Sequence, residues 1–70
     1  MSVQLKINGE LKTFESEMPG TLAALLEQLG VDAATVVAEV EGVIIERAKF
    51  GSTVLRSGQN IELIRFVGGG

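Results

Sequence analysis

The sequence ends in three consecutive glycines, Gly68, Gly69 and Gly70. Glycine has no side chain to bury and loses more conformational freedom on ordering than any other residue. The run therefore predicts a flexible tail of residues 68–70 after a folded domain of residues 1–67. Because short glycine runs are also common linker material, the composition of the tail alone leaves both interpretations open.

The end of this tail offers one kind of chemistry. The carboxylate of Gly70 has no neighbouring Cβ, so it can enter a narrow channel in another protein. A carboxylate is inert until it is activated, and adenylation converts it into an acyl electrophile that a sulfur or nitrogen nucleophile can attack. The tail follows an apolar segment without a polar spacer, which favours Gly70 as the reactive group over a leftover linker.

No set of side chains predicts catalysis. Nucleophilic catalysis needs a serine, threonine or cysteine beside a base, but the sequence contains no histidine and no cysteine. Ser52, Thr53 and Ser57 fall in turn-like segments. Glu39 and Glu41 are two residues apart on a predicted strand, where they would share a face and form a carboxylate pair or a metal site. A solvated strand face is the favoured interpretation, so we predict a chain that is not an enzyme and binds no metal or cofactor.

Composition and charge narrow the class of protein. The 70 residues allow one small domain, and a hydrophobic content of 46% with only three phenylalanines predicts an aliphatic core. The formal charge is −3 and the six basic residues are scattered, which argues against a nucleic-acid partner. No apolar run has the length of a membrane span, and the first residues do not resemble a signal peptide. These features predict a cytoplasmic protein without a membrane partner.

Alternating apolar residues predict an N-terminal hairpin. Val3, Leu5 and Ile7 alternate with polar residues, so residues 2–7 are expected to form a half-buried strand. The dipeptide Asn8-Gly9 favours a type I′ turn. Residues 11–15 then form the returning strand.

A helix is expected after this hairpin. Thr21 is a suitable N-cap, and Gly30 is a suitable residue to follow the helix end. Four leucines between them share one face and are expected to pack into the core: Leu22, Leu25, Leu26 and Leu29.

The second half of the chain predicts three more strands, at residues 36–41, 43–46 and 60–67. Residues 47–50 fit either a helical turn or a loop. One helix cannot cover both faces of a sheet, so we expect an α+β fold in which a mixed sheet of four to five strands carries one main helix on one face. The last strand is expected to lie beside the first and parallel to it.

The last predicted strand has two apolar faces. Ile61 and Leu63 lie on one side, whereas Ile64 and Phe66 lie on the other. If the first pair faces the helix, an apolar patch remains on the uncovered side. We predict that Val37, Ile64, Phe66 and Val67 form a partner-binding patch that leads to the tail. The alternative is that a loop or a bulge buries these side chains.

The order of elements and the terminal Gly-Gly resemble the ubiquitin-like β-grasp proteins. The segment from Ile64 to Gly70 and the central segment from Val37 to Arg47 are similar to the ThiS family, the sulfur carriers of thiamin biosynthesis. The resemblance implies that an E1-like (ThiF-like) adenylyltransferase uses ATP to adenylate Gly70. A desulfurase system then supplies sulfur for a thiocarboxylate, and a ThiG-like thiazole synthase accepts that sulfur.

The resemblance implies that Gly70 is the modified residue and that Gly69 is the other residue of the terminal glycine pair. Gly68 departs from the pattern, because a bulkier residue often stands there. Other readings remain: a molybdopterin-synthase small subunit, a tRNA-thiolation carrier, a modifier conjugated to lysines, or a ubiquitin-like interaction module that is never activated.

Overall fold

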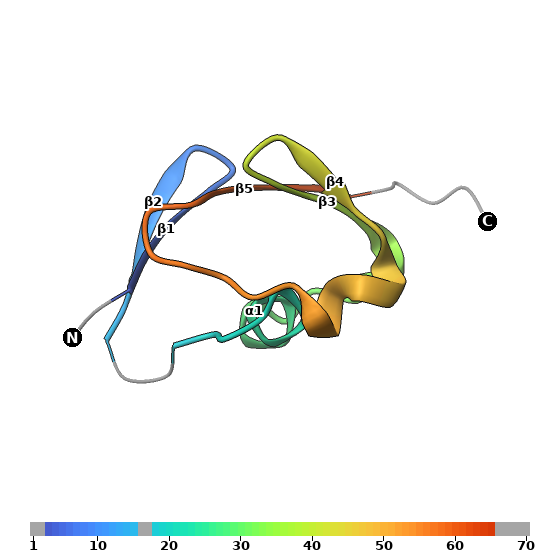
Figure 1. Cartoon of the computed structure of the whole chain (residues 1–70), viewed down its shortest axis with the longest axis horizontal. Coiled ribbons are helices and arrows are strands. Elements are labelled where there is room, and N and C mark those ends of the chain that lie inside the picture. The colour runs from blue at the N-terminus through green and yellow to red at the C-terminus, as the bar shows by residue number, and fades with distance from the viewer. Residues whose placement is uncertain (1–2, 16–17, 66–70) are drawn as a thin grey trace.

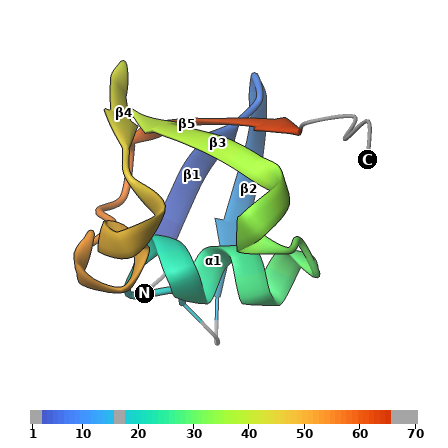
Figure 2. The same cartoon turned by 90° about the vertical axis from the view of Figure 1, so that its right-hand side faces the viewer.

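The computed structural model describes residues 3–15 and 18–65, which form one sheet and one main helix. The elements are β1 (Val3–Ile7), β2 (Glu10–Phe14), α1 (Leu22–Leu29), β3 (Val36–Val40), β4 (Val43–Ile45) and β5 (Asn60–Arg65). Two short 3₁₀ helices, Ala33–Thr35 and Arg47–Ser52, stand before β3 and after β4. The five strands are ordered β2-β1-β5-β3-β4, and α1 lies on one side of the sheet (Figures 1 and 2). The predicted α+β architecture is confirmed.

The last strand occupies the centre of the sheet. β5 runs parallel to β1 and antiparallel to β3. The prediction that the first and last strands form a parallel central pair is therefore confirmed. Two antiparallel hairpins, β1–β2 and β3–β4, flank β5 from its two sides (Figure 1).

Local signals in the sequence explain where α1 begins and ends. The Oγ1 atom of Thr21 accepts a hydrogen bond from the main-chain N–H of Ala24 at 3.2 Å, as an N-cap does. Gly30 has a φ of 70°, the left-handed conformation in which a glycine can end a helix without steric cost. Among the helices in residues 3–15 and 18–65, none combines the length and the apolar character needed to cross a membrane.

The core fills the space between α1 and the sheet. Three leucines of the predicted stripe are buried, and Leu29 is partly buried at the end of the helix. Phe50, in the 3₁₀ helix after β4, is 3% exposed and closes one end of the core. The open question about residues 47–50 is thus answered by a helical turn that Phe50 anchors. The buried residues are Leu5, Ile7, Leu22, Leu25, Leu26, Val36, Ala38, Val40, Phe50, Leu55 and Ile61.

Candidate functional site

The two faces of β5 differ as the alternation of its residues predicts. Ile61 is 1% exposed and Leu63 packs against the core, so both face α1. Ile64 is 49% exposed on the opposite side. The β3–β5 register runs through five consecutive pairs from Val36 opposite Arg65 to Val40 opposite Ile61. The alternative in which a bulge buries Ile64 is therefore wrong.

On the face of the sheet that α1 leaves uncovered, the neighbouring strands β5, β3 and β4 each contribute an apolar side chain, and we call these three the open-face patch: Val37, Ile44 and Ile64. Val37 lies directly opposite Ile64 across the β3–β5 ladder and is half-buried. Ile44, on the edge strand β4, is 66% exposed and lies opposite Glu39. Exposed apolar groups gathered on one face are a common feature of protein-binding surfaces.

Two acidic residues border the open-face patch. Glu39 lies directly opposite Glu62 in the β3–β5 ladder. This pair is the neighbour of Val37 and Ile64 on the same face of the sheet, because side chains alternate between the two faces along each strand. Along β5 the open face thus presents first Glu62 and then Ile64, in the direction of residues 66–70. Like charges in directly opposed positions destabilise a sheet. Positive charge brought to this border by another molecule would relieve that repulsion.

A side chain from the first hairpin holds β5 against β1. Asn8 has a φ of 52° and Gly9 a φ of 83°, the positive values that a type I′ turn requires. The N–H of Asn8 donates to the carbonyl of Ile61 at 2.9 Å. The Oδ1 atom of the same residue accepts a hydrogen bond from the N–H of Leu63 at 2.7 Å. This bond extends the parallel ladder toward the end of β5.

The second hairpin holds the beginning of β5 in the same way. Glu41 and Gly42 have φ values of 52° and 80°. The N–H of Glu41 donates to the carbonyl of Asn60 at 2.8 Å, and the Oε2 atom of Glu41 accepts from the N–H of Asn60. The prediction that Glu39 and Glu41 share a strand face is wrong, because β3 ends at Val40 and Glu41 lies in the turn.

The other candidate side chains have structural partners. The hydroxyls of Ser52 and Thr53 donate to the carbonyl of Lys49. The Oγ atom of Ser57 accepts from the N–H of Gln4 at 3.0 Å. In the described part of the chain, no group of three or more acidic side chains is placed to hold a metal ion.

The terminal segment that the sequence singles out lies outside the described residues. Phe66, Val67, Gly68, Gly69 and Gly70 follow Arg65, the last residue of β5. Their roles in docking and modification stay predictions. The strand that leads to them is described as far as Arg65, and it is the central strand of the sheet.

Comparison with known proteins identifies the family of this chain. Residues 5–70 match the ThiS family, so the match covers the central strand and the terminal glycines together. The chain belongs to the ThiS family. A crystal structure of the thiamine biosynthesis protein (ThiS) from Geobacter metallireducens superimposes with a TM-score of 0.83 at 32% identity, covering 97% of this chain and 100% of that one.

Relatives in other organisms extend the comparison. A thiazole synthase of Paramagnetospirillum magneticum is 35% identical over 68 residues, and one of Magnetococcus marinus is 32% identical over 68 residues. These alignments cover 97% of this chain, which spans only about a fifth (20%) of the length of either thiazole synthase. The uncharacterized protein ycf40 of Pyropia yezoensis is 32% identical over 69 residues and is matched over 94% of its length.

The family assignment confirms the predicted ubiquitin-like β-grasp fold, with its five-stranded mixed sheet and one main helix. Sequence reasoning missed three contributors to the site of this ThiS-family chain: Ile44 in the open-face patch, and the side-chain bonds of Asn8 and Glu41 to β5. A signal for Ile44 was present. A two-residue turn at Glu41-Gly42 places Ile44 opposite Glu39, on the uncovered face. The two side-chain bonds depend on contacts between distant segments and had no local signal.

Proposed function

We propose that this ThiS-family chain is a sulfur carrier of thiamin biosynthesis and acts as a co-substrate, not as an enzyme. The observation that carries the proposal is the family match, which runs from β1 through Gly70. The fold supports it, because the strand before the tail is held on both sides by its neighbours and by the side chains of Asn8 and Glu41. A rigid domain joined to a glycine tail suits a protein that presents its own end to an enzyme.

The proposed chemistry takes place at the carboxylate of Gly70. An E1-like (ThiF-like) adenylyltransferase binds ATP, and the carboxylate attacks the α-phosphate to form an acyl adenylate with release of pyrophosphate. Sulfur from a desulfurase system, reduced to the level of sulfide by a thiol reductant, then attacks the acyl carbon and displaces AMP, which leaves a thiocarboxylate. This chain supplies the acyl group and no catalytic side chain, and it holds no cofactor itself.

Docking on the activating enzyme is assigned to the open-face patch together with Phe66 and Val67. Ile64 and Val37 are cross-strand neighbours, and Ile64 lies two residues before Phe66. An apolar centre with a charged border is the usual composition of a protein interface. Contacts there would bring residues 66–70 to the enzyme while the rest of the domain stays unchanged.

The proposed acceptor of the sulfur is a thiazole synthase (ThiG-like). Two proteins named thiazole synthase contain a segment that resembles nearly all of this chain. A carrier-like segment within the same polypeptide as a thiazole synthase supports a direct encounter of the two in this pathway. This link favours thiamin biosynthesis over the molybdopterin alternative.

Mass spectrometry of the terminal peptide tests the proposal. The chain ending at Gly70 is incubated with ATP, sulfide and a ThiF-like adenylyltransferase, and then cleaved with trypsin after Arg65. The released peptide, residues 66–70, contains no methionine. Oxidation of Met1 or Met18, which adds nearly the same mass as exchanging oxygen for sulfur, therefore cannot be mistaken for the product.

We expect an alkylatable thiocarboxylate on Gly70 that requires ATP and is absent from a variant lacking Gly70. If the peptide keeps an ordinary carboxylate while a known ThiS protein is converted in parallel, the carrier proposal is overturned. The chain would then be treated as a ubiquitin-like interaction module.

A further inference from the structure

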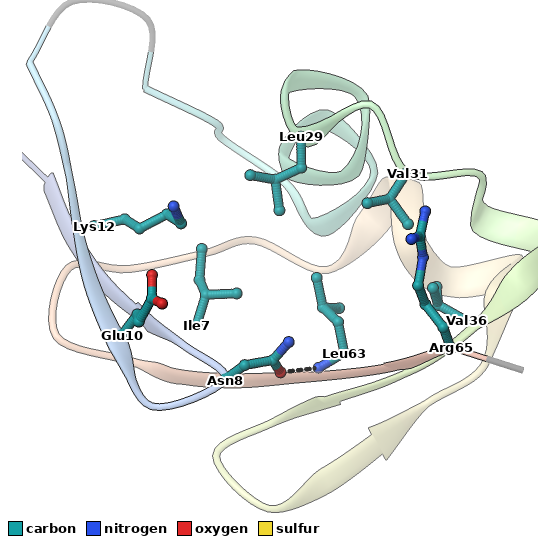
Figure 3. A pocket seen from close by; sticks show the side chains of 9 residues that line it. All are labelled: Ile7, Asn8, Glu10, Lys12, Leu29, Val31, Val36, Leu63 and Arg65. Carbon is teal, nitrogen blue, oxygen red and sulfur yellow. Dashed lines mark hydrogen bonds between the residues drawn. The ribbon is translucent and has the colours of Figure 1, made fainter.

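A groove opens between the sheet and the end of α1, on the side of the sheet opposite the open-face patch (Figure 3). Its volume is about 340 Å³, within the range of small-molecule sites. The apolar lining consists of Ile7, Leu29, Val31, Val36 and Leu63. Polar or charged side chains complete it: Asn8, Glu10, Lys12 and Arg65.

The groove exists because α1 is short and β2 is polar on its inner face. α1 ends at Leu29. The β1–β2 register places Glu10 opposite Ile7 and Lys12 opposite Leu5, so both charged side chains point to the side on which the core lies. Inward-pointing charges also protect an edge strand from pairing with other chains. That role explains why β2 carries charges there, but it does not explain the apolar walls or Arg65.

Charge distinguishes the groove from the rest of the molecule. The chain carries a net charge of −3 and only six basic residues, yet two of the six line this groove. Figure 3 shows Lys12 on one side of it and Arg65 on the other, with Leu63 and Leu29 between them. Within residues 3–15 and 18–65, neither cation is engaged by an acidic side chain. Glu10 also lines the groove and offsets one of the two positive charges, so the lining carries a net charge of about +1.

We propose that this groove binds a small amphipathic anion, a carboxylate or phosphate monoester on an apolar body of about six carbons. The body would displace water from Leu29, Val31 and Leu63, and the anionic group would lie within reach of Lys12 or Arg65. Burial of apolar surface supplies affinity, while the two cations select the sign of the charge. The proposal does not depend on the carrier function, because it uses neither Gly70 nor the open-face patch.

Titration of ¹⁵N-labelled protein followed by NMR tests the groove with four probes of one chain length. Hexanoate and hexyl phosphate carry the proposed anion, whereas hexan-1-ol and hexylammonium carry the same apolar body without it. We expect hexanoate or hexyl phosphate to shift the amide signals of Lys12, Val31 and Leu63, with the alcohol and the amine binding at least about threefold more weakly. The tighter of the two anions identifies the carboxylate or the phosphate class.

Charge variants sharpen the test. Lys12→Gln and Arg65→Gln should each weaken the binding of the better anion about threefold, and the double variant about tenfold. Glu10→Gln should strengthen it, because the repelling carboxylate is gone. Lys6→Gln is the matched control, since Lys6 is a lysine on the neighbouring strand β1 that points to the uncovered face. Equal binding of hexan-1-ol, unchanged affinity in the double variant, or shifts confined to the open face would each overturn the proposal.

Discussion

Ile61 and Ile64 are identical residues three positions apart on β5, yet the first is 1% exposed and the second 49% exposed. The difference arises because α1 covers one face of the sheet and nothing in the described part of the chain covers the other. On the inner face, isoleucine stabilises the fold by leaving water. On the open face it gains little from folding, and its exposure there beside Val37 is the basis of the proposed docking surface.

The contrast between the two faces is tested most directly by truncating one isoleucine on each face to alanine. Ile61→Ala should lower the free energy of unfolding by about 2–5 kcal/mol, because it opens a cavity in the core. Ile64→Ala should lower it by less than about 1 kcal/mol. Urea denaturation followed by circular dichroism measures both. If Ile61→Ala does not fold, Ile61→Val should still cost about 0.5–1.5 kcal/mol. Equal costs for the two alanine variants would contradict the assignment of faces.

A charge on the open face tests docking rather than stability. Ile64→Asp should raise the KM of the activating enzyme for this chain at least about tenfold, because a charge would enter an apolar contact. Leu11→Asp is the matched control: Leu11 is 64% exposed on the same face, but it lies on the far edge strand β2. Steady-state kinetics with the chain as variable substrate makes the measurement. An equal rise in both variants would show that the open-face patch is not the docking surface.

Removing the side-chain hydrogen bond between the first hairpin and β5 is expected to have a smaller effect than the changes at Ile61 and Ile64. Asn8→Gly keeps the positive φ that the turn needs but removes the acceptor for the N–H of Leu63. We expect a loss of about 1 kcal/mol in unfolding free energy and faster hydrogen exchange at the Leu63 amide. Asn8→Asp keeps an acceptor and should retain most of the protection. Unchanged exchange in Asn8→Gly would mean that the side-chain bond contributes nothing.

Removing one of the opposed acids should produce the smallest change in stability and sharpen the contrast between the faces. Glu62→Gln relieves the repulsion with Glu39 and should raise the unfolding free energy by about 0.2–1 kcal/mol, more at low salt. If the partner brings positive charge to this border, the same variant should bind the activating enzyme more weakly. A variant that is both less stable and tighter-binding would refute this interpretation of the acidic border.

Much of the fold was predictable because its signals are local. The alternation in β1, the Asn8-Gly9 turn, the Thr21 cap and the Gly30 stop each involve residues close in sequence, and the structure confirms all four. The prediction for Glu41 failed for the opposite reason. Alternation continues through Glu41 in the sequence, but the two-residue turn begins there and its carboxylate binds Asn60, nineteen positions away.

The sequence by itself determined the α+β class, the helix and its ends, and the two faces of the last strand, because periodicity and backbone preferences act over a few residues. Only the tertiary structure decided that Ile44 joins Val37 and Ile64 and that Asn8 and Glu41 bind β5. It alone brought Lys12 and Arg65 to one groove. These contacts join residues far apart in the chain, and their geometry exists only after β5 has entered the sheet between the two hairpins.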